Sequence, residues 1–239
     1  MESASGNLER PSVSALLRGE AALLRAWLER GDARRLVLCL GVIAVGAGLY
    51  GAAMGWWRAP QQALYTAIKL PLILLLTATG NALLNAMLAP LLGLSLSLRQ
   101  SFFAILMSLT IAAAVLGSFS PLAAFVVWNT PPLSAGERIS NSTYNLMLLT
   151  HVVVVAFAGI VANLRLVKLL RELSGSRAVA ARVLLGWLAG NLFLGSQLSW
   201  ILRPFVGSPV LPVAFLRETA FKGNFYETVF GLLQHSLNL

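Results

Sequence analysis

Five long apolar stretches most constrain how this 239-residue chain can fold. Hydrophobic residues make up 57% of the composition and charged residues only 11%, which is too little charge for the surface of a water-soluble domain of this length. A helix needs about 20 apolar residues to cross a hydrocarbon core about 30 Å thick. The sequence therefore predicts an all-α fold, a polytopic transmembrane helical bundle with five spans in contact with the lipid bilayer.

The predicted spans are separated by prolines and short polar segments. Pro71 is placed near the start of the second span and Pro90 near its end, where a missing N–H group is tolerated. Residues 58–66 are expected to form a short connection before that span. The third apolar stretch is too long for a straight crossing, and Pro121 within it predicts a kink or a break. The expected spans are 36–57, 67–93, 101–128, 143–164 and 183–202.

Amphipathic segments flank the spans, so the chain divides into a tail (1–34), a transmembrane domain (35–203) and a far-side tail (204–239). Residues 12–30 repeat apolar side chains, among them Trp27, at helical spacing with arginines between them. This pattern is typical of an interfacial helix that lies on the membrane, and a helix packed against a soluble partner is the alternative. Residues 224–237 predict a second interfacial amphipathic helix.

The basic residues are distributed unevenly between the two sides of the predicted bundle. One side holds twelve of the eighteen lysines and arginines, namely Arg10, Arg18, Arg25, Arg30, Arg34, Arg35, Arg99, Arg165, Lys168, Arg171, Arg177 and Arg182. The other side holds six, namely Arg58, Lys69, Arg138, Arg203, Arg217 and Lys222. This bias predicts a cytoplasmic N-terminus, a C-terminus across the membrane and contact with anionic lipid headgroups, not with nucleic acid. The composition suggests a bacterial inner membrane.

Small residues at a spacing of four mark two of the spans as close-packing helices. In the first span they are Ala44, Gly48, Gly51 and Gly55, and in the fifth they are Gly186 and Gly190. Such faces let helix backbones approach closely, so each is expected to meet another span. The partner span can belong to the same chain or to another one.

Polar residues inside the spans are the candidate functional residues, because each costs free energy in lipid unless it is satisfied. They are Asn81, Asn85, Asn191 and Gln197, with His151 in the fourth span. The amides either form hydrogen bonds between helices or line a polar seam that binds or conducts a solute. His151 is a candidate cofactor ligand, and a structural hydrogen bond is the alternative.

The chain is poorly equipped as an enzyme. Asp32, outside the spans, is the only aspartate and Cys39 the only cysteine, so a paired aspartyl site and a cysteine metal site within one chain are excluded. The spacing of metalloprotease, nucleophile-elbow and P-loop motifs is also missing. No catalytic residue, no metal site and no required cofactor are predicted.

Two short segments resemble the Yip-domain family of integral membrane proteins, in particular its bacterial members. They are Leu49-Tyr50-Gly51, late in the first span, and Ala67-Ile68-Lys69-Leu70-Pro71-Leu72, at the start of the second. The resemblance covers about residues 35–203 and implies a five-span membrane organiser or helper protein, not an enzyme. The eukaryotic relatives act in vesicle traffic with small GTPases, through a longer N-terminal region than residues 1–34 provide here.

These observations favour a non-enzymatic membrane protein that acts as an assembly scaffold or as an accessory subunit of a membrane complex. Its expected partners are another membrane protein or further copies of itself. The alternative is a channel or transporter with a path lined by Asn81, Asn85, Asn191 and Gln197. A second alternative is a pigment- or cofactor-binding accessory subunit that uses His151.

Overall fold

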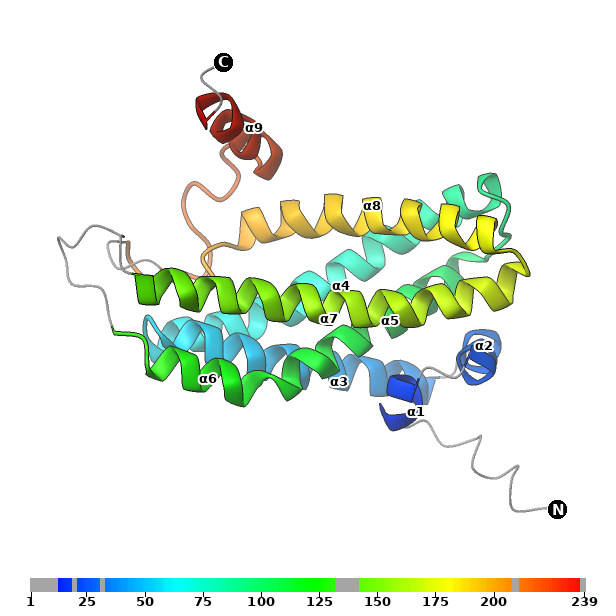
Figure 1. Ribbon diagram of the computed structural model, residues 1–239, viewed down its shortest axis with the longest axis horizontal. Coiled ribbons are helices and arrows are strands. Elements are labelled where there is room, and N and C mark those ends of the chain that lie inside the picture. The colour runs from blue at the N-terminus through cyan, green and yellow to red at the C-terminus, as the bar shows by residue number, and fades with distance from the viewer. Residues whose placement is uncertain (1–12, 19–20, 31–32, 132–141, 208–210, 237–239) are drawn as a thin grey trace.

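A computed structural model describes residues 13–18, 21–30, 33–131, 142–207 and 211–236. Within these ranges the regular structure is helical, and the helices form a bundle (Figure 1). They are α1 (Val13–Arg18), α2 (Ala21–Arg30), α3 (Ala33–Trp56), α4 (Pro60–Leu91), α5 (Leu98–Ser118), α6 (Ser120–Trp128), α7 (Ser142–Ser174), α8 (Arg177–Leu202) and α9 (Phe225–Ser236). Five of them, α3, α4, α5, α7 and α8, are long and apolar enough to cross a membrane. The predicted all-α bundle with five spans is confirmed, and the chain is an integral membrane protein.

The second span differs from the prediction at its start. Helix α4 begins at Pro60, so most of the segment 58–66 is helical and the prediction of a connection there was wrong. Proline is favoured in the first turn of a helix because its fixed φ suits the helix and its missing N–H would have no partner there. Consequently Pro71 lies inside α4 and not near its start.

The third apolar stretch is divided into two helices, as the position of Pro121 predicts. Helix α5 begins at a capping box, in which the Ser97 side chain accepts from the Gln100 backbone and the Gln100 side chain accepts from the Ser97 backbone. It ends at Ser118, and Ser120 and Pro121 open α6 after Phe119. Because α6 is a separate short helix, α5 alone provides the third span.

Glycines let α3 pack closely on both of its neighbours. On one side Gly46 lies against the α5 backbone at Ala113, where a Cβ would collide with the Ala113 carbonyl oxygen. On the other side Gly51 and Gly55 lie against the α4 backbone at Thr66 and Gln62. Helix α4 also packs on α8, and α5 packs on α7. The core of the bundle therefore centres on α3, α4 and α5.

The N-terminal helices are held against the bundle. The apolar side chains Leu24, Trp27 and Leu28 of α2 are buried, and α2 packs on α5 and α7. Arg35 of α3 secures this contact, because its Nη1 donates to the Ala26 carbonyl at 3.1 Å and its guanidinium lies 5.3 Å from the centre of the Trp27 ring. The apolar face expected to meet lipid is thus covered by protein.

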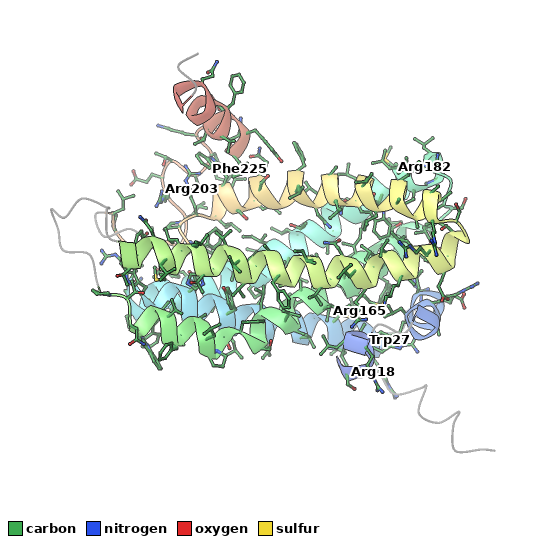
Figure 2. All side chains as sticks on the ribbon, in the orientation of Figure 1. Arg18, Trp27, Arg165, Arg182, Arg203 and Phe225 are labelled. Atoms are coloured by element: carbon green, nitrogen blue, oxygen red, sulfur yellow. The ribbon has the colours of Figure 1, made fainter. Side chains whose placement is uncertain are left out.

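The C-terminal helix α9 stands beside α8, away from the rest of the bundle (Figure 1). Its Tyr226 ring stacks on Phe193 with 5.8 Å between centroids, and the Tyr226 hydroxyl lies 2.9 Å from Ser196 Oγ. The aromatic side chains Phe225, Tyr226 and Phe230 stay exposed. Figure 2 places this helix near Arg203, whereas Arg18 and Arg182 lie toward the opposite end of the bundle.

Candidate functional site

The most polar feature within the spans is one face of α4, which we call the α4 polar stripe. Its members fall into two groups with steps of three or four residues, separated by one step of eight: Gln62, Thr66 and Lys69, and then Thr77, Asn81 and Asn85. All six are buried, and five of them, all but Thr77, have no exposed surface. At this spacing the side chains share one face of the helix, so the stripe runs along α4 within the protein.

The inner part of the stripe meets α8 through an amide seam formed by Asn81, Asn85 and Asn191. Asn81 Nδ2 donates to Asn191 Oδ1 at 2.6 Å and to the Trp187 carbonyl at 3.1 Å. Asn85 Nδ2 donates to Asn81 Oδ1 at 2.6 Å and to the Asn81 carbonyl at 2.8 Å. Three of the four predicted seam residues, Asn81, Asn85 and Asn191, are therefore brought together, with Asn81 at the centre.

Glycine permits this close contact between α4 and α8. A Cβ at Gly190 would collide with the Asn81 side-chain oxygen, so only glycine leaves room for the central amide. Gly186, one turn earlier, lies against Leu92, with 3.2 Å between its would-be Cβ and Leu92 Cδ1. Both small residues of the fifth span thus contact α4 or the residue that follows it.

The seam does not extend to Gln197. This side chain lies further along α8, where its Oε1 is 3.5 Å from the Phe225 backbone nitrogen at the start of α9. Within the seam, Asn85 Oδ1 and the neighbouring Thr77 Oγ1 and Trp187 Nε1 are buried without a hydrogen-bond partner in the protein. The amide donors of Asn81 and Asn85, by contrast, are engaged with protein acceptors. This arrangement can hold two helices together in lipid.

The outer part of the stripe holds the segment that follows α8, and we call this contact the linker clamp. Gln62 Nε2 donates to the carbonyls of Pro204 at 2.9 Å and Phe205 at 3.1 Å. Thr66 Oγ1 donates to the Phe205 carbonyl at 2.7 Å. Lys69 Nζ donates to the Pro204 carbonyl at 3.1 Å. Two carbonyls of an irregular segment are thereby satisfied by side chains of one helix.

The linker clamp was missed by sequence reasoning, although a signal for it was present. Gln62 and Thr66 were assigned to a connection, so their helical spacing with Lys69 was not considered. Extending the face of Thr77, Asn81 and Asn85 backward by steps of three and four residues reaches all three. The carbonyl partners, more than 130 residues away in the chain, carry no such signal.

His151 forms a separate polar contact between α3 and α7. Its Nδ1 shares a hydrogen bond of 2.9 Å with the Tyr50 hydroxyl, and the two rings meet edge to face. Its Nε2 is buried and has no hydrogen-bond partner in the part of the chain that the structure describes. One ring nitrogen is therefore used structurally, and the other is available to a ligand that enters the bundle.

The small residues of the first span lie on different sides of α3. Gly51 and Gly55 pack against α4, and Gly48 also faces α4 with 3.4 Å between its would-be Cβ and the Ala67 carbonyl oxygen. Ala44 is exposed on the surface of the bundle. The three glycines thus serve packing within this chain, and a contact between subunits has to use another face.

No group of three or more histidine, cysteine, aspartate and glutamate side chains is placed to hold a metal ion in the part of the chain that the structure describes. The one cysteine, Cys39, is buried in the core. No protein-family model, curated protein or solved structure matches the chain. A function for this chain therefore has to be argued from the geometry of the α4 polar stripe and of the bundle surface.

Proposed function

We propose that this chain is a non-catalytic membrane protein that acts as an assembly subunit, and that it pairs with a second copy of itself through α3. The supporting observation is an apolar groove on the lipid-facing side of α3. One hollow of 510 Å³ is lined by residues of α3 and by Gly117 of α5. It shares Leu49 with a second hollow of 260 Å³ that reaches Trp128 of α6.

The α3 residues along this groove favour a helix as its occupant. They follow the alternating spacing of three and four that characterises a left-handed helix pair: Leu38, Val42, Val45, Leu49, Ala52 and Trp56. Val45 is 63% exposed and Leu49 is 54% exposed, so these side chains are free to enter a facing helix. Most soluble homo-oligomers pair about a two-fold axis through the same patch on both subunits, and the proposal therefore takes a second copy of this chain as the occupant.

Gly41 provides a test that leaves the fold intact. A Cβ at Gly41 would meet no atom within 4 Å, and Gly159 on α7 offers the same open space as a matched control. We expect wild-type protein and Gly159→Leu to be dimeric in lipid nanodiscs or by cross-linking in the native membrane. Gly41→Leu should weaken the dimer at least tenfold because the new side chain fills the groove.

Two results would refute the pairing. A monomeric wild-type protein at every lipid-to-protein ratio would exclude self-association. Equal dimerisation of Gly41→Leu and Gly159→Leu would show that the contact lies elsewhere.

The proposal places the basic end of the bundle in the cytoplasm of a bacterial cell, following the charge bias. The similarity of two short segments to bacterial Yip-domain proteins favours the same non-catalytic class.

Conduction through the amide seam is the rival function, and the hydrogen bonds argue against it. The amide donors of Asn81 and Asn85 are already satisfied by Asn191, by each other and by backbone carbonyls, so a solute would have to displace them. Liposomes containing purified protein should therefore show no ion flux above that of empty liposomes. Flux that disappears in Asn81→Leu would instead support a conducting path.

A further inference from the structure

Positive charge accumulates where the segment after α8 crosses α4. Lys69 is fully buried there, while Arg203 and Arg217 are half-buried. Arg217 lies near enough to act electrostatically on both of the other cations. The exposed glutamates of the same tail, Glu218 and Glu227, form no ion pair with them in the described part of the chain. The site therefore collects like charges without a described counter-charge.

Such a site is unfavourable unless an anion completes it. A buried charge costs free energy unless it is paired, and repulsion between cations grows as water is removed. Lys69 has one hydrogen bond, to the Pro204 carbonyl, and its Nζ lies 5.3 Å from the centre of the Phe215 ring. These two contacts orient the ammonium group but do not neutralise its charge. Burial, and then the positive charge of Arg217, also lower the pKa of Arg203.

Hydrogen-bond donors without acceptors lie beside the same cations. The Arg203 guanidinium is fixed 3.5 Å above the Trp200 ring, and its Nη1 donates to the Trp200 carbonyl at 2.7 Å. Among the described residues, Trp200 Nε1 is buried without an acceptor, and so is Nε of Arg58, whose side chain packs against Gly207. A planar, fixed guanidinium with further donors nearby suits an oxyanion such as phosphate.

Lys69 lies close to the boundary between the hydrocarbon core and the lipid headgroups. Lys69 follows the start of α4 by nine residues, which corresponds to about 14 Å of helix. The 32 residues of α4 span about 48 Å, against about 30 Å for the hydrocarbon core, so about 9 Å projects at each end if the helix is centred. The backbone of Lys69 then lies about 5 Å inside the core, a depth from which a long cationic side chain reaches the headgroup region. Trp57 and Tyr144, whose rings pack 4.8 Å apart at the same end, are typical of this interface.

We propose that Arg203 and Arg217, together with the buried Lys69, form a binding site for a phosphate-type oxyanion at the far-side membrane interface. The group can belong to a phospholipid headgroup or to a free phosphate. Either one supplies the missing negative charge and acceptors for the unused donors. Binding also holds the segment 203–207 against α4, in the contact that forms the linker clamp. This site is independent of the α3 groove and of self-association.

The experiment uses full-length protein in an uncharged maltoside detergent, which contains no phosphate. Inorganic phosphate is compared with chloride at equal ionic strength. Separately, phosphatidylglycerol is compared with diacylglycerol of the same acyl chains. The readout is hydrogen exchange at the backbone amides of residues 205–207. We expect phosphatidylglycerol, phosphate or both to slow this exchange at least tenfold, because the anion draws the segment onto α4.

The two ligands distinguish the sources of the oxyanion. Protection by phosphatidylglycerol alone identifies a lipid headgroup, and protection by inorganic phosphate alone identifies a free phosphate. Arg217→Gln should reduce the protection at least fivefold, whereas Lys222→Gln, which removes an exposed cation from the same tail, should leave it unchanged. If Arg217→Gln does not give monodisperse protein, Arg203→Gln takes its place.

Two outcomes would overturn the proposal. Exchange in the wild-type protein that responds no more to phosphate than to chloride, and no more to phosphatidylglycerol than to diacylglycerol, would show that no oxyanion binds. Equal responses of Arg217→Gln and Lys222→Gln would show general attraction to a basic tail. The first comparison needs no variant, so a folding defect cannot obscure it.

Discussion

The two parts of the α4 polar stripe differ in how their polar side chains find hydrogen-bond partners within the bundle. At the amide seam, neutral side chains of α4 and α8 satisfy one another, with Asn81 as both donor and acceptor. At the linker clamp, Gln62, Thr66 and the charged Lys69 donate to carbonyls of an irregular segment. In the first contact the amide donors of Asn81 and Asn85 are satisfied by protein acceptors, although Asn85 Oδ1 has no partner among the described residues. The second leaves a positive charge without a counter-charge in the described residues.

This difference separates a structural contact from a candidate binding site. Amide donors that are already bonded to protein acceptors have little to gain from a ligand, and their removal lowers the stability of the bundle. A buried cation among other cations gains from any anion that reaches it. Of the two parts of the stripe, we therefore expect the seam to contribute more to stability and the clamp to contribute more to the response to a ligand. Four substitutions test this expectation, in order of decreasing effect.

The largest loss of thermal stability is expected from Gly51→Leu, which acts on the contact between α3 and α4. A side chain at Gly51 would collide with the Thr66 carbonyl and force α3 from α4, at a cost of about 3 kcal/mol or more. Cys39 is the single cysteine and is fully buried, so its reaction with a thiol dye during heating reports unfolding. Gly159→Leu, at an open position, should unfold like wild type.

Asn81→Leu should have the next largest effect, because it removes the centre of the amide seam. The change abolishes the bonds to Asn191 and to the Trp187 carbonyl and leaves polar groups unpaired at membrane depth, which costs roughly 2 kcal/mol. Asn163→Leu is the control, since that amide bonds only within its own helix, to the Gly159 carbonyl. If Cys39 begins to react with the dye at the same temperature in Asn81→Leu and Asn163→Leu, the seam does not stabilise the bundle.

Gln62→Leu should act locally, on the segment after α8. Two carbonyls lose a donor, which lowers the free energy of opening residues 203–207 by about 1 kcal/mol. The amides of this segment should then exchange about fivefold faster. Gln61→Leu alters the neighbouring, exposed amide, which bonds to Tyr65, and should not change this exchange. The Cys39 labelling temperature should fall less than in Asn81→Leu. A larger fall would reverse the expected order of the two parts of the stripe.

The smallest effect is expected from Tyr50→Phe, which lies off the stripe. It removes the single hydrogen bond between α3 and His151, and single bonds between membrane helices are worth about 0.6 kcal/mol on average. Tyr65→Phe, at a half-buried position on α4, serves as control in the same thermal assay. A loss as large as that of Asn81→Leu would indicate that His151 has a greater structural role than one bond implies.

Local features of the sequence predicted much of this architecture. The break before Pro121 and the positions of the five spans follow from apolar length and proline chemistry, which act over a few residues. The start of α4 was misplaced because the polar residues Gln62 and Thr66 resemble a connection until their carbonyl partners are known. At the start of α4, the residue types of a helix face that is buried against protein resemble those of a segment that faces water.

The candidate site was predicted only in part, for the same reason. The shared face of Asn81 and Asn85 was visible in the spacing, and Asn191 could be named as a polar residue of another span. The rotation of α8 and its position along α4 decide which of its polar residues reaches the seam. They bring Asn191 to Asn81 and leave Gln197 near α9. Likewise, the spacing of Gly51 and Gly55 predicted a close contact but not that α4 would fill it.

The amino-acid sequence alone was enough to establish that the chain spans a membrane, where its helices lie and how its positive charges are divided. These properties depend on hydropathy, helical period and residues close together in the chain. Which helix faces are already occupied, and which stay open, became clear from the packing of the bundle. This packing uses three glycines of α3 for α4, leaves a separate face of α3 open and brings Arg217 near both Lys69 and Arg203. Such contacts join residues distant in the chain, so no local pattern encodes them.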